Sequence, residues 1–351
     1  MTKKRRKVKK SQKIIGALII FIALLCFVLG GIYILFDQYY GSSDFVEDDD
    51  VTIDQNVVDQ LEKETIVFGE ADQEEIEELV KPVEKPITEE EAKGTYNLLL
   101  IGVDVRDVQW HGNSDSMILV TVNHDTKKIY MTSFMRDLYA EIPGYGVRKL
   151  NAAHAIGGGP LLIQTMETTY GVVIDNYARV DFSSLTNIID IVGGVDIDVS
   201  AAEAEVANGY ISEMCTLQGK DYEANKIKTY GMQRLSGIQA VAYCRIRYVG
   251  NADFERTSRQ REVLTALVNQ ARNMGIGQLN TLINEVVPLV THNVEPNTVL
   301  SLISQVPSFL SYEFVTERVP FDGLYVTKSE ILIPNMAETI RRLRDTLYAD
   351  K

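Results

Sequence analysis

The sequence is poor in the residues that most often bind metals or act as nucleophiles. Its 351 residues include three cysteines and four histidines. The histidines stand singly, and no cysteine–histidine spacing is typical of zinc, so we expect neither a zinc centre nor a catalytic histidine. Cys215 and Cys244 are the only cysteines outside an apolar run near the N-terminus. A disulfide between them is allowed outside the cytoplasm, but the apolar surroundings of Cys244 are more typical of a buried small hydrophobe.

Two common phosphate- and calcium-binding motifs are also missing. The run GGGP at residues 157–160 is not followed by the GK[ST] that completes a P-loop, so we expect a turn before a helix there. The acidic runs EDDD at 47–50 and DQEEIEEL at 72–79 do not match the EF-hand spacing. They are typical of solvated charge rather than of a calcium loop.

Charge is absent from residues 14–36, an uninterrupted apolar run. At about 1.5 Å per residue, a helix of this length spans about 35 Å, enough for the ~30 Å hydrocarbon core of a membrane. A cleaved signal peptide is the alternative, but its apolar core would be about 7–15 residues long and would end at an A-x-A-like site. Residues 1–13 carry eight lysines and arginines and no acid, which favours a cytoplasmic flank. We therefore expect a single-pass protein of the cell membrane whose remaining chain lies outside.

Cations are scarce in the next segment, residues 37–95, which hold twenty acids and four lysines. Like charges repel and extend such a segment, so we interpret it as an acidic extracytoplasmic stalk. It separates the membrane anchor from a domain at residues 96–351. The whole chain has a net charge of -14, so a cluster of positive charge in this domain stands out.

Apolar, β-branched runs alternate with helical patterns along residues 96–351. This alternation predicts a sheet covered by helices on both faces, an α/β/α sandwich. The expected strands are 96–104, 116–123, 128–137, 195–200 and 312–319, with another leading through residues 245–247. The expected helices are 159–171, 183–194, 258–275, 280–291, 297–305 and 334–348.

Five arginines fall within CRIRYVGNADFERTSRQR, residues 244–261. Alternate residues of a strand face the same side, so the expected strand would direct Arg245 and Arg247 together. Arg256 and Gln260 lie four residues apart and share a face if the following helix begins before Arg256. Arginine matches phosphate oxygens with a planar fork of donors. The alternative is a set of surface ion pairs with nearby acids, which are common and contribute little. Those acids are Asp253, Glu255 and Glu262.

Two further stretches favour an anion site. Asp104 ends the first expected strand and Asp115 opens the second, and paired carboxylates suit Mg²⁺ bound with phosphate oxygens. Either aspartate alone could also be a loop cap. Arg136 ends the third strand, and ligands of open α/β sheets sit beyond the carboxyl ends of strands. Together these residues predict a metal–pyrophosphate site.

The order of motifs then becomes specific. NLLLIGVDVR, SDSMILVTVN, SFMRD, KLNAAHAIGGGP, YARVDF, VGGVDIDV, LSGIQAVAYCRIRY and DFERTSRQR follow one another over residues 96 to about 270. The series resembles the LytR–CpsA–Psr (LCP) family. The resemblance implies an Mg²⁺-dependent phosphotransferase, with Mn²⁺ as an alternative ion. Such an enzyme attaches a glycopolymer from an undecaprenyl-pyrophosphate carrier to peptidoglycan through a phosphodiester. The glycopolymer is a teichoic acid, a capsule or another secondary wall polysaccharide.

The resemblance also assigns roles by position. The metal would be held by Asp104 and Asp115. The pyrophosphate would be bound by Arg136, Arg245, Arg247, Arg256 and Gln260, and Arg136, Arg245 and Arg247 would be catalytic. To these residues we add Arg106 as a pyrophosphate ligand and Asp253 as a catalytic residue on their position alone. Asp253 and Asp104 are both candidates for the general base. Many members carry a basic residue soon after the RD pair; here Leu138 to Ala140 follow, so Arg106 or Lys149 would replace it. The resemblance adds an apolar tunnel for the polyprenyl chain.

The expected partners are therefore the lipid-linked glycopolymer, peptidoglycan and the cell membrane. Nucleic acid is not expected, because the only strongly basic segment is the membrane flank at 1–13. Two alternatives use the same features. A polyprenyl-pyrophosphate hydrolase or binding module would need the arginines but no acceptor. An envelope-associated regulator, such as a transcriptional attenuator, would need neither the acids nor the arginines.

Overall fold

The computed structural model describes residues 41, 43–63, 68–81, 86–103, 111–250, 252–309 and 311–348. The predicted flank and anchor, together with Asp104 and Arg106, lie outside these residues. In the part of the chain that is described, none of the helices has the length and apolar character needed to cross a membrane.

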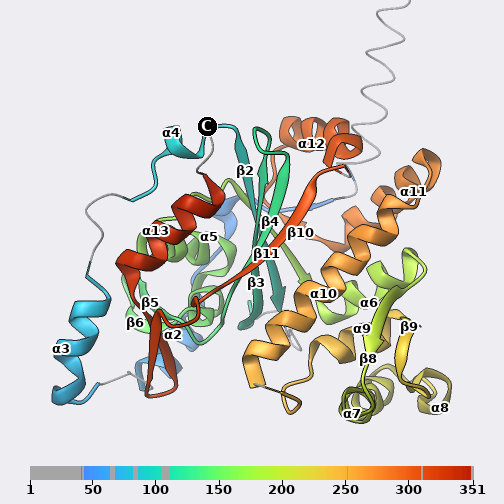
Figure 1. Ribbon diagram of the computed structural model, residues 1–351, viewed down its shortest axis with the longest axis horizontal. Helices are drawn as coiled ribbons and strands as arrows, with labels where there is room; N and C mark the ends of the chain where they lie inside the picture. The colour runs from blue at the N-terminus through green and yellow to red at the C-terminus, as the bar shows by residue number, and fades with distance from the viewer. Residues whose placement is uncertain are drawn as a thin grey trace, which may run out of the picture.

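A seven-stranded mixed sheet forms the centre of the fold (Figure 1). Its order is β1–β10–β7–β2–β3–β4–β11. β3 runs antiparallel to its neighbours β2 and β4, whereas β7 and β11 are parallel to their neighbours β2 and β4. The strands are β1 (Asp44–Phe45), β2 (Thr95–Val103), β3 (Ser114–Asn123), β4 (Lys128–Phe134), β7 (Asn176–Asp181), β10 (Thr291–His292) and β11 (Glu313–Val319).

Both faces of the sheet are apolar, as the continuous apolar runs in the sequence require. In β2, Leu99 and Ile101 are buried in a core with α2 (Gln55–Lys63), α5 (Asn151–Tyr170) and α13 (Met336–Leu347). Leu98 and Leu100 point to the opposite face, toward α10 (Ala252–Arg272), α11 (Ile276–Val286) and α12 (Pro296–Phe309). Figure 1 shows these helices on the two sides of the sheet, so the layered α/β arrangement is present.

A second core lies beside the sheet (Figure 1). It is formed by α6 (Phe182–Ile191), β8 (Val195–Val199), α7 (Ala201–Gln218), β9 (Gly231–Leu235) and α9 (Gly237–Cys244), packed with α10. The sequence did not predict α7, although Ser200 and Glu203 form a capping box at its start. Cys215 and Cys244 are both buried in this core and unpaired.

The remaining elements are short. They are the 3₁₀ helices Asp48–Asp50 (η1) and Val287–Leu289 (η2), α3 (Glu70–Leu79), α4 (Glu89–Ala92), β5 (Tyr139–Ile142), β6 (Gly146–Lys149), α8 (Tyr222–Asn225), β12 (Tyr325–Lys328) and β13 (Ile331–Pro334).

The strand expected at residues 245–247 is not formed. The preceding run is instead the helix α9, which Ser236 and Gln239 begin with a capping box, and Arg245 is its C-terminal cap. An apolar run of this length fits either a buried helix or a buried strand, and the cap selects the helix. Arg245 and Arg247 therefore do not share the face of a strand.

The described part of the predicted stalk is not an extended spacer. Phe45 in β1 pairs with His292 at the edge of the sheet, and Val57 and Ile76 are buried in the main core. Lys328 on β12 forms ion pairs with acids of α3, at 2.8 Å to Asp72 and 3.0 Å to Glu75. A few apolar anchors and this cation thus fix an acidic segment whose net charge alone favours extension.

The GGG run produces a kink inside α5 rather than a turn before it. Gly157 and Gly158 have non-helical backbone angles, and the φ of Gly158 is +61°. The next residue, Gly159, packs against Tyr177 so closely that an added Cβ would lie 2.6 Å from atoms of its ring. This contact holds α5 against β7.

Replacing Gly159 with alanine should therefore destabilise the fold. The new methyl group would push against a buried ring, and overpacking of this kind costs about 1–3 kcal/mol. Gly209, inside α7, is the matched control because an added Cβ meets no atom within 4 Å. Gly209→Ala should stabilise by about 0.5–1 kcal/mol through helix propensity. Urea unfolding measures the stability of each variant relative to wild type. Equal stability of the two variants would contradict the close contact between Gly159 and Tyr177.

Candidate functional site: an arginine–aspartate cluster

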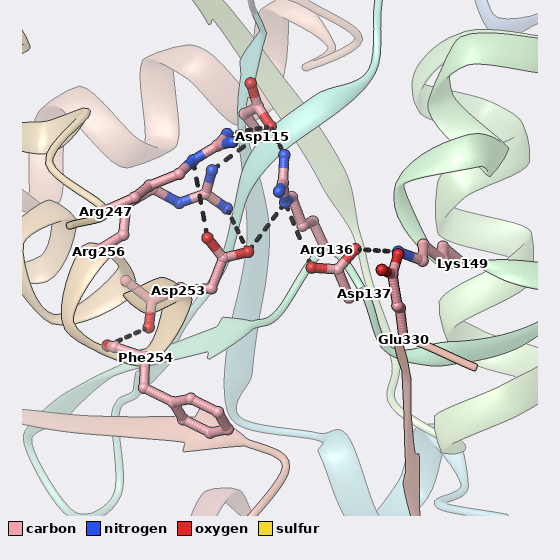
Figure 2. Close-up of polar contacts among 10 residues, drawn as sticks. Asp115, Arg136, Asp137, Lys149, Arg247, Asp253, Phe254, Arg256 and Glu330 are labelled. Atoms are coloured by element: carbon pink, nitrogen blue, oxygen red, sulfur yellow. Dashed lines mark hydrogen bonds and ion pairs between the residues drawn. The ribbon is translucent and has the colours of Figure 1, made fainter. Parts of the chain in front are cut away.

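Three arginines and two aspartates meet where β3, β4 and α10 come together (Figure 2). Arg136 follows the end of β4, Asp115 lies near the start of β3, and Asp253 and Arg256 lie in the first turns of α10. Arg247 comes from the segment between α9 and α10. We call these five residues the arginine cluster. Their position beyond the end of β4 is where the sequence predicted an anion site.

An irregularity in strand pairing places Asp115. Gly102 of β2 pairs with Ser116, but its neighbour Val103 pairs with Ser114, so Asp115 is the extra residue on β3. Extra residues of this kind bend a strand and redirect its side chains, and they are frequent beside active sites. Here the bulge accompanies a carboxylate that meets the arginines of the cluster.

Each arginine of the cluster contacts both aspartates. Arg136 is the closest, with Nη1 at 2.9 Å from Asp115 Oδ1 and Nε at 3.0 Å from Asp253 Oδ2. Arg247 lies 3.6 Å from Asp115 and 3.7 Å from Asp253. Arg256 lies 3.7 Å from Asp115 and 3.4 Å from Asp253. Among these five residues three cations share two anions, and the neighbouring Asp137 is itself shared between Arg136 and Lys149. Positive charge is thus in excess within the cluster and favours an anionic ligand.

Burial makes this arrangement sensitive to charge. The side chain of Arg256 is 2% exposed, and its Nε has no hydrogen-bond partner among the described residues. Burial, together with the neighbouring Arg136 and Arg247, lowers the pKa of Arg256 to about 10 despite the attraction of Asp253. Burial alone would raise the pKa of Asp253, but the surrounding arginines outweigh it and lower that pKa. Both groups therefore remain charged near neutral pH.

Arg245 is held apart from the cluster. Its guanidinium lies between two aromatic rings, 5.2 Å from the centre of Phe182 and 4.8 Å from that of Tyr210, and pairs with Glu213 at 3.2 Å. These three partners were not singled out as site residues from the sequence, although Phe182 lies in the YARVDF motif. Arg245 and Gln260 nevertheless line one cavity of about 200 Å³ with residues of the cluster. The site therefore has a tightly paired part and an aromatic side.

The other two arginines of the run serve elsewhere. Arg259 is buried, pairs with Glu203 at 2.8 Å, and donates hydrogen bonds to the carbonyl groups of Ile246 and Val249. It thereby fixes the segment that carries Arg247. Arg261 points away from the cluster and lines a different groove. Neither Arg259 nor Arg261 therefore forms the simple surface ion pair that was the alternative interpretation of this run.

A second chain of charges extends from Arg136 (Figure 2). Its Nε lies 3.4 Å from Asp137, whose other oxygen is 2.9 Å from Lys149. Lys149 is also 3.9 Å from Glu330 at the tip of the β12–β13 hairpin. Lys149 is one of the two residues that the sequence offers in place of the basic residue many family members carry. It lies next to the cluster, but its charge is directed at two carboxylates.

One predicted metal ligand lies in the described residues. The shortest contacts of Asp115 with the three arginines all involve its Oδ1. The described residues contain no group of three or more acids, histidines or cysteines arranged to hold a metal. An ion at Asp115 would thus depend on Asp104, which lies outside them, and on ligand oxygens. Such a sparse donor set fits Mg²⁺ bound together with phosphates.

An apolar cavity of about 520 Å³ lies between the sheet and the helices α10, α11 and α12. It is lined almost entirely by aliphatic and aromatic side chains, including Leu264 and Val268 of α10 and Leu100 of β2. Arg256, Gln260, Leu264 and Val268 follow one another at intervals of four residues. Because that spacing keeps side chains on one face of a helix, α10 carries a face that changes from polar at the cluster to apolar in the cavity.

Comparison with known proteins shows the family of the chain. The sequence profile of the LytR_cpsA_psr family matches residues 60–345. The chain belongs to this family. The match begins within the acidic segment that packs on the domain and ends in α13.

Relatives within the family carry two kinds of name. A polyisoprenyl-teichoic acid–peptidoglycan teichoic acid transferase, TagU of Oceanobacillus iheyensis, is 32% identical over 284 residues, 79% of this chain and 74% of that protein. Biofilm regulatory protein A of Streptococcus mutans is 31% identical over 229 residues, which cover 62% of this chain and 53% of that protein. The chain thus matches only about half the length of the second relative.

Solved structures of the family share the fold. The structure of the LytR-CPS2A-psr family protein YwtF (TagT) with bound octaprenyl pyrophosphate lipid, from Bacillus subtilis, has a TM-score of 0.53 and 23% identity. The comparison covers 77% of this chain and 96% of that one. At this identity the likeness establishes the mixed α/β fold.

Proposed function

We propose that this protein transfers a glycopolymer from a polyprenyl-pyrophosphate carrier to peptidoglycan. The observation that carries the proposal is the arginine cluster, in which three guanidinium groups share two carboxylates beside a 520 Å³ apolar cavity. A lipid pyrophosphate has the same two parts, a polyanionic head and a long apolar chain. The names of the teichoic acid transferases in the family support the same reaction class.

The cavity would receive the polyprenyl chain. The face of α10 described above connects the two sites, because Gln260 lines the polar cavity and Leu264, one turn later, lines the apolar one. A chain lying along this face would place its pyrophosphate at the N-terminal turns of α10, beside Arg256. Burial of the chain would supply binding energy of about 0.8 kcal/mol per CH₂ group.

The reaction would be a phosphoryl transfer. A hydroxyl oxygen of peptidoglycan attacks the phosphorus that carries the glycopolymer and forms a new phosphorus–oxygen bond. The bond from that phosphorus to the bridging oxygen breaks, and polyprenyl phosphate leaves with the electron pair. The hydroxyl proton passes to a carboxylate or to solvent. Arg136, Arg247 and Arg256 would stabilise the charge that develops on the phosphate oxygens.

Asp253 is poorly suited to accept that proton. Each of its two oxygens contacts an arginine, and its lowered pKa makes it a weak base. We assign to Asp253 the positioning of three guanidinium groups. Asp104, the other candidate base, could accept the proton only when it is not holding the metal, so that solvent is the alternative acceptor. Mg²⁺, held by Asp115 with Asp104, would neutralise part of the charge on the leaving phosphate.

The cellular setting is part of the proposal. The apolar run at 14–36 would anchor the chain in the cell membrane, where the lipid carrier resides, with the domain on the outside. An undecaprenyl carrier and a teichoic acid, capsule or other wall polysaccharide would fit this site. A regulatory role, as in the name of one relative, would not require an arginine cluster beside an apolar cavity.

The test is reconstituted transfer. The full chain in detergent is incubated with Mg²⁺, a polyprenyl-pyrophosphate glycan and uncrosslinked peptidoglycan, and the phosphodiester product is measured by mass spectrometry. We expect glycan on peptidoglycan in equimolar amount with polyprenyl phosphate, and loss of the product with EDTA. Release of phosphate without transfer would show a hydrolase instead. No turnover and no lipid binding would contradict the proposal.

A further inference from the structure

A polar groove crosses α10 on a side turned away from the apolar cavity. Its volume is about 530 Å³, and nearly all the side chains that line it are polar. Most come from α10, with Asp196 from β8 on one border and Thr316 from β11 on another. We call this the α10 groove. None of its lining residues lines the cavity at the arginine cluster.

Arg261 is the charge in this groove that has no ionic partner in the described part of the chain. Its Nη1 is buried and makes no hydrogen bond there. The two lining carboxylates are already engaged: Asp196 accepts two hydrogen bonds from Arg234, at 2.9 and 2.6 Å, and Glu262 accepts one from Tyr243 at 2.8 Å. Burial and the nearby Arg318 lower the pKa of Arg261, with Glu317 opposing them. A desolvated, unpaired guanidinium of this kind favours an anion.

Neutral hydrogen-bonding groups surround this charge. In the ranges that the structure describes, the hydroxyls of Ser258 and Thr316 make no hydrogen bond within the protein, nor does Nδ2 of Asn269 or Oδ1 of Asn273. Amides and hydroxyls arranged along a groove match the hydroxyl and acetamido groups of a sugar chain. The lining therefore fits a glycan that also carries an acidic group.

The helix separates the groove from the lipid. Arg261 and Thr265 each follow by one residue a side chain of the cluster–cavity face, Gln260 and Leu264, and are thus turned about 100° from it around α10. A donor lipid in the apolar cavity leaves the groove open. In-line displacement needs the attacking hydroxyl on the side opposite the leaving lipid phosphate, so the second substrate should not share the cavity.

We propose that the α10 groove binds the acceptor, a peptidoglycan strand whose carboxylate pairs with Arg261 and whose sugars hydrogen-bond to Asn269 and Asn273. This inference rests on the proposed transfer reaction and names the part of the protein that selects its acceptor. It makes Arg261 a substrate-binding residue that takes no part in holding the pyrophosphate.

Binding of each substrate can be measured separately. Soluble, uncrosslinked peptidoglycan fragments are titrated by calorimetry into the full chain in detergent, with Arg261→Gln as the test variant. Arg341→Gln, which changes the same charge on the exposed surface of α13, is the matched control. We expect Arg261→Gln to raise the Kd for the fragments at least tenfold, with Arg341→Gln unchanged. The Kd for a polyprenyl pyrophosphate should be the same in all three proteins.

A second variant keeps the inference testable if Arg261→Gln folds poorly in a melting experiment. Asn273 is exposed, so Asn273→Ala should fold and should weaken fragment binding by removing the amide that hydrogen-bonds to the acceptor's sugars. Unchanged fragment binding in either folded variant would overturn the inference. So would a loss of affinity for a lipid-free phosphate polymer that leaves fragment binding intact, because the groove would then hold the donor's glycan. If wild type binds fragments but neither binds nor transfers the lipid-linked glycan, the proposed function fails and the acceptor site stands.

Discussion

Replacing Arg247 with alanine should reduce transfer about 10²–10³-fold, the usual effect of losing one preorganised donor to a developing anion. Arg247 is the most exposed guanidinium of the cluster at 35%, compared with 23% for Arg136 and 2% for Arg256, so a ligand reaches it most readily. Its removal also cancels the excess positive charge, because two arginines would then face Asp115 and Asp253. Turnover of the lipid-linked glycan under single-turnover conditions measures the effect.

Stability provides the control for this variant. Asp115 and Asp253 keep Arg136 and Arg256 as partners, so the free energy of unfolding of Arg247→Ala should lie within about 1 kcal/mol of the wild-type value. Arg341→Ala, which breaks exposed ion pairs with Glu338 and Asp345 on α13, should retain full activity. Equal activity of Arg247→Ala and Arg341→Ala would show that the cluster does not contact the reacting phosphate.

Acid should destabilise the protein through His154. This side chain is fully buried in α5, its Nδ1 is 2.8 Å from the carbonyl oxygen of Gly112, and burial lowers its pKa to about 3. Arg179 and His111 oppose its protonation further. In the unfolded chain the His154 side chain is protonated below about pH 6.5, whereas in the folded protein it is protonated only below about pH 3. The free energy of unfolding should thus fall by about 1.4 kcal/mol per pH unit below pH 6.5, and level off below pH 3.

A variant separates this effect from the many carboxylates that titrate in the same range. His154→Asn retains a donor for the carbonyl of Gly112 but cannot titrate. Between pH 6.5 and pH 5, the stability of wild type should decline by about 2 kcal/mol more than that of the variant in urea unfolding. Parallel curves would mean that His154 is protonated in the folded protein, and the packing around it would then need another explanation.

Four strands of the main sheet, β2, β3, β4 and β11, could be predicted because they are long and apolar, whereas β1, β7 and β10 were not predicted. β2, β3 and β4 lie within a residue or two of the expected ranges, apart from the end of β4, and Gly171 caps α5 in the left-handed conformation at the predicted stop. The acidic segment was harder to predict, since five buried apolar side chains, among them Val57 and Ile76, fix its packing while twenty acids dominate its composition. Burial of single side chains leaves little trace in a local pattern.

The sequence predicted which residues of the site come together better than it predicted the elements that bring them there. Arg247 and Arg256 do meet Asp115 and Arg136, yet Arg247 reaches them from a loop that Arg259 fixes rather than from a strand. The bulge at Asp115 and the aromatic pair around Arg245 depend on strand register and on contacts distant in sequence. Local propensity carries no information on strand register or on contacts between distant residues. The order of motifs along the chain carries both indirectly, because it indicates the family fold.

The continuous face of α10 has a consequence for how the length of this helix can vary. Inserting one residue between Gln260 and Leu264 would rotate everything after it by about 100°, so Leu264 and Val268 would leave the apolar cavity while Arg256 stayed in place. A single substitution in α10 changes one contact. A single-residue insertion or deletion would instead separate the polar site at Arg256 from the apolar cavity in one step. The number of residues between Arg256 and Val268 therefore matters more than the identity of the residues in between. Functional family members should conserve this spacing more strictly than those intervening residues.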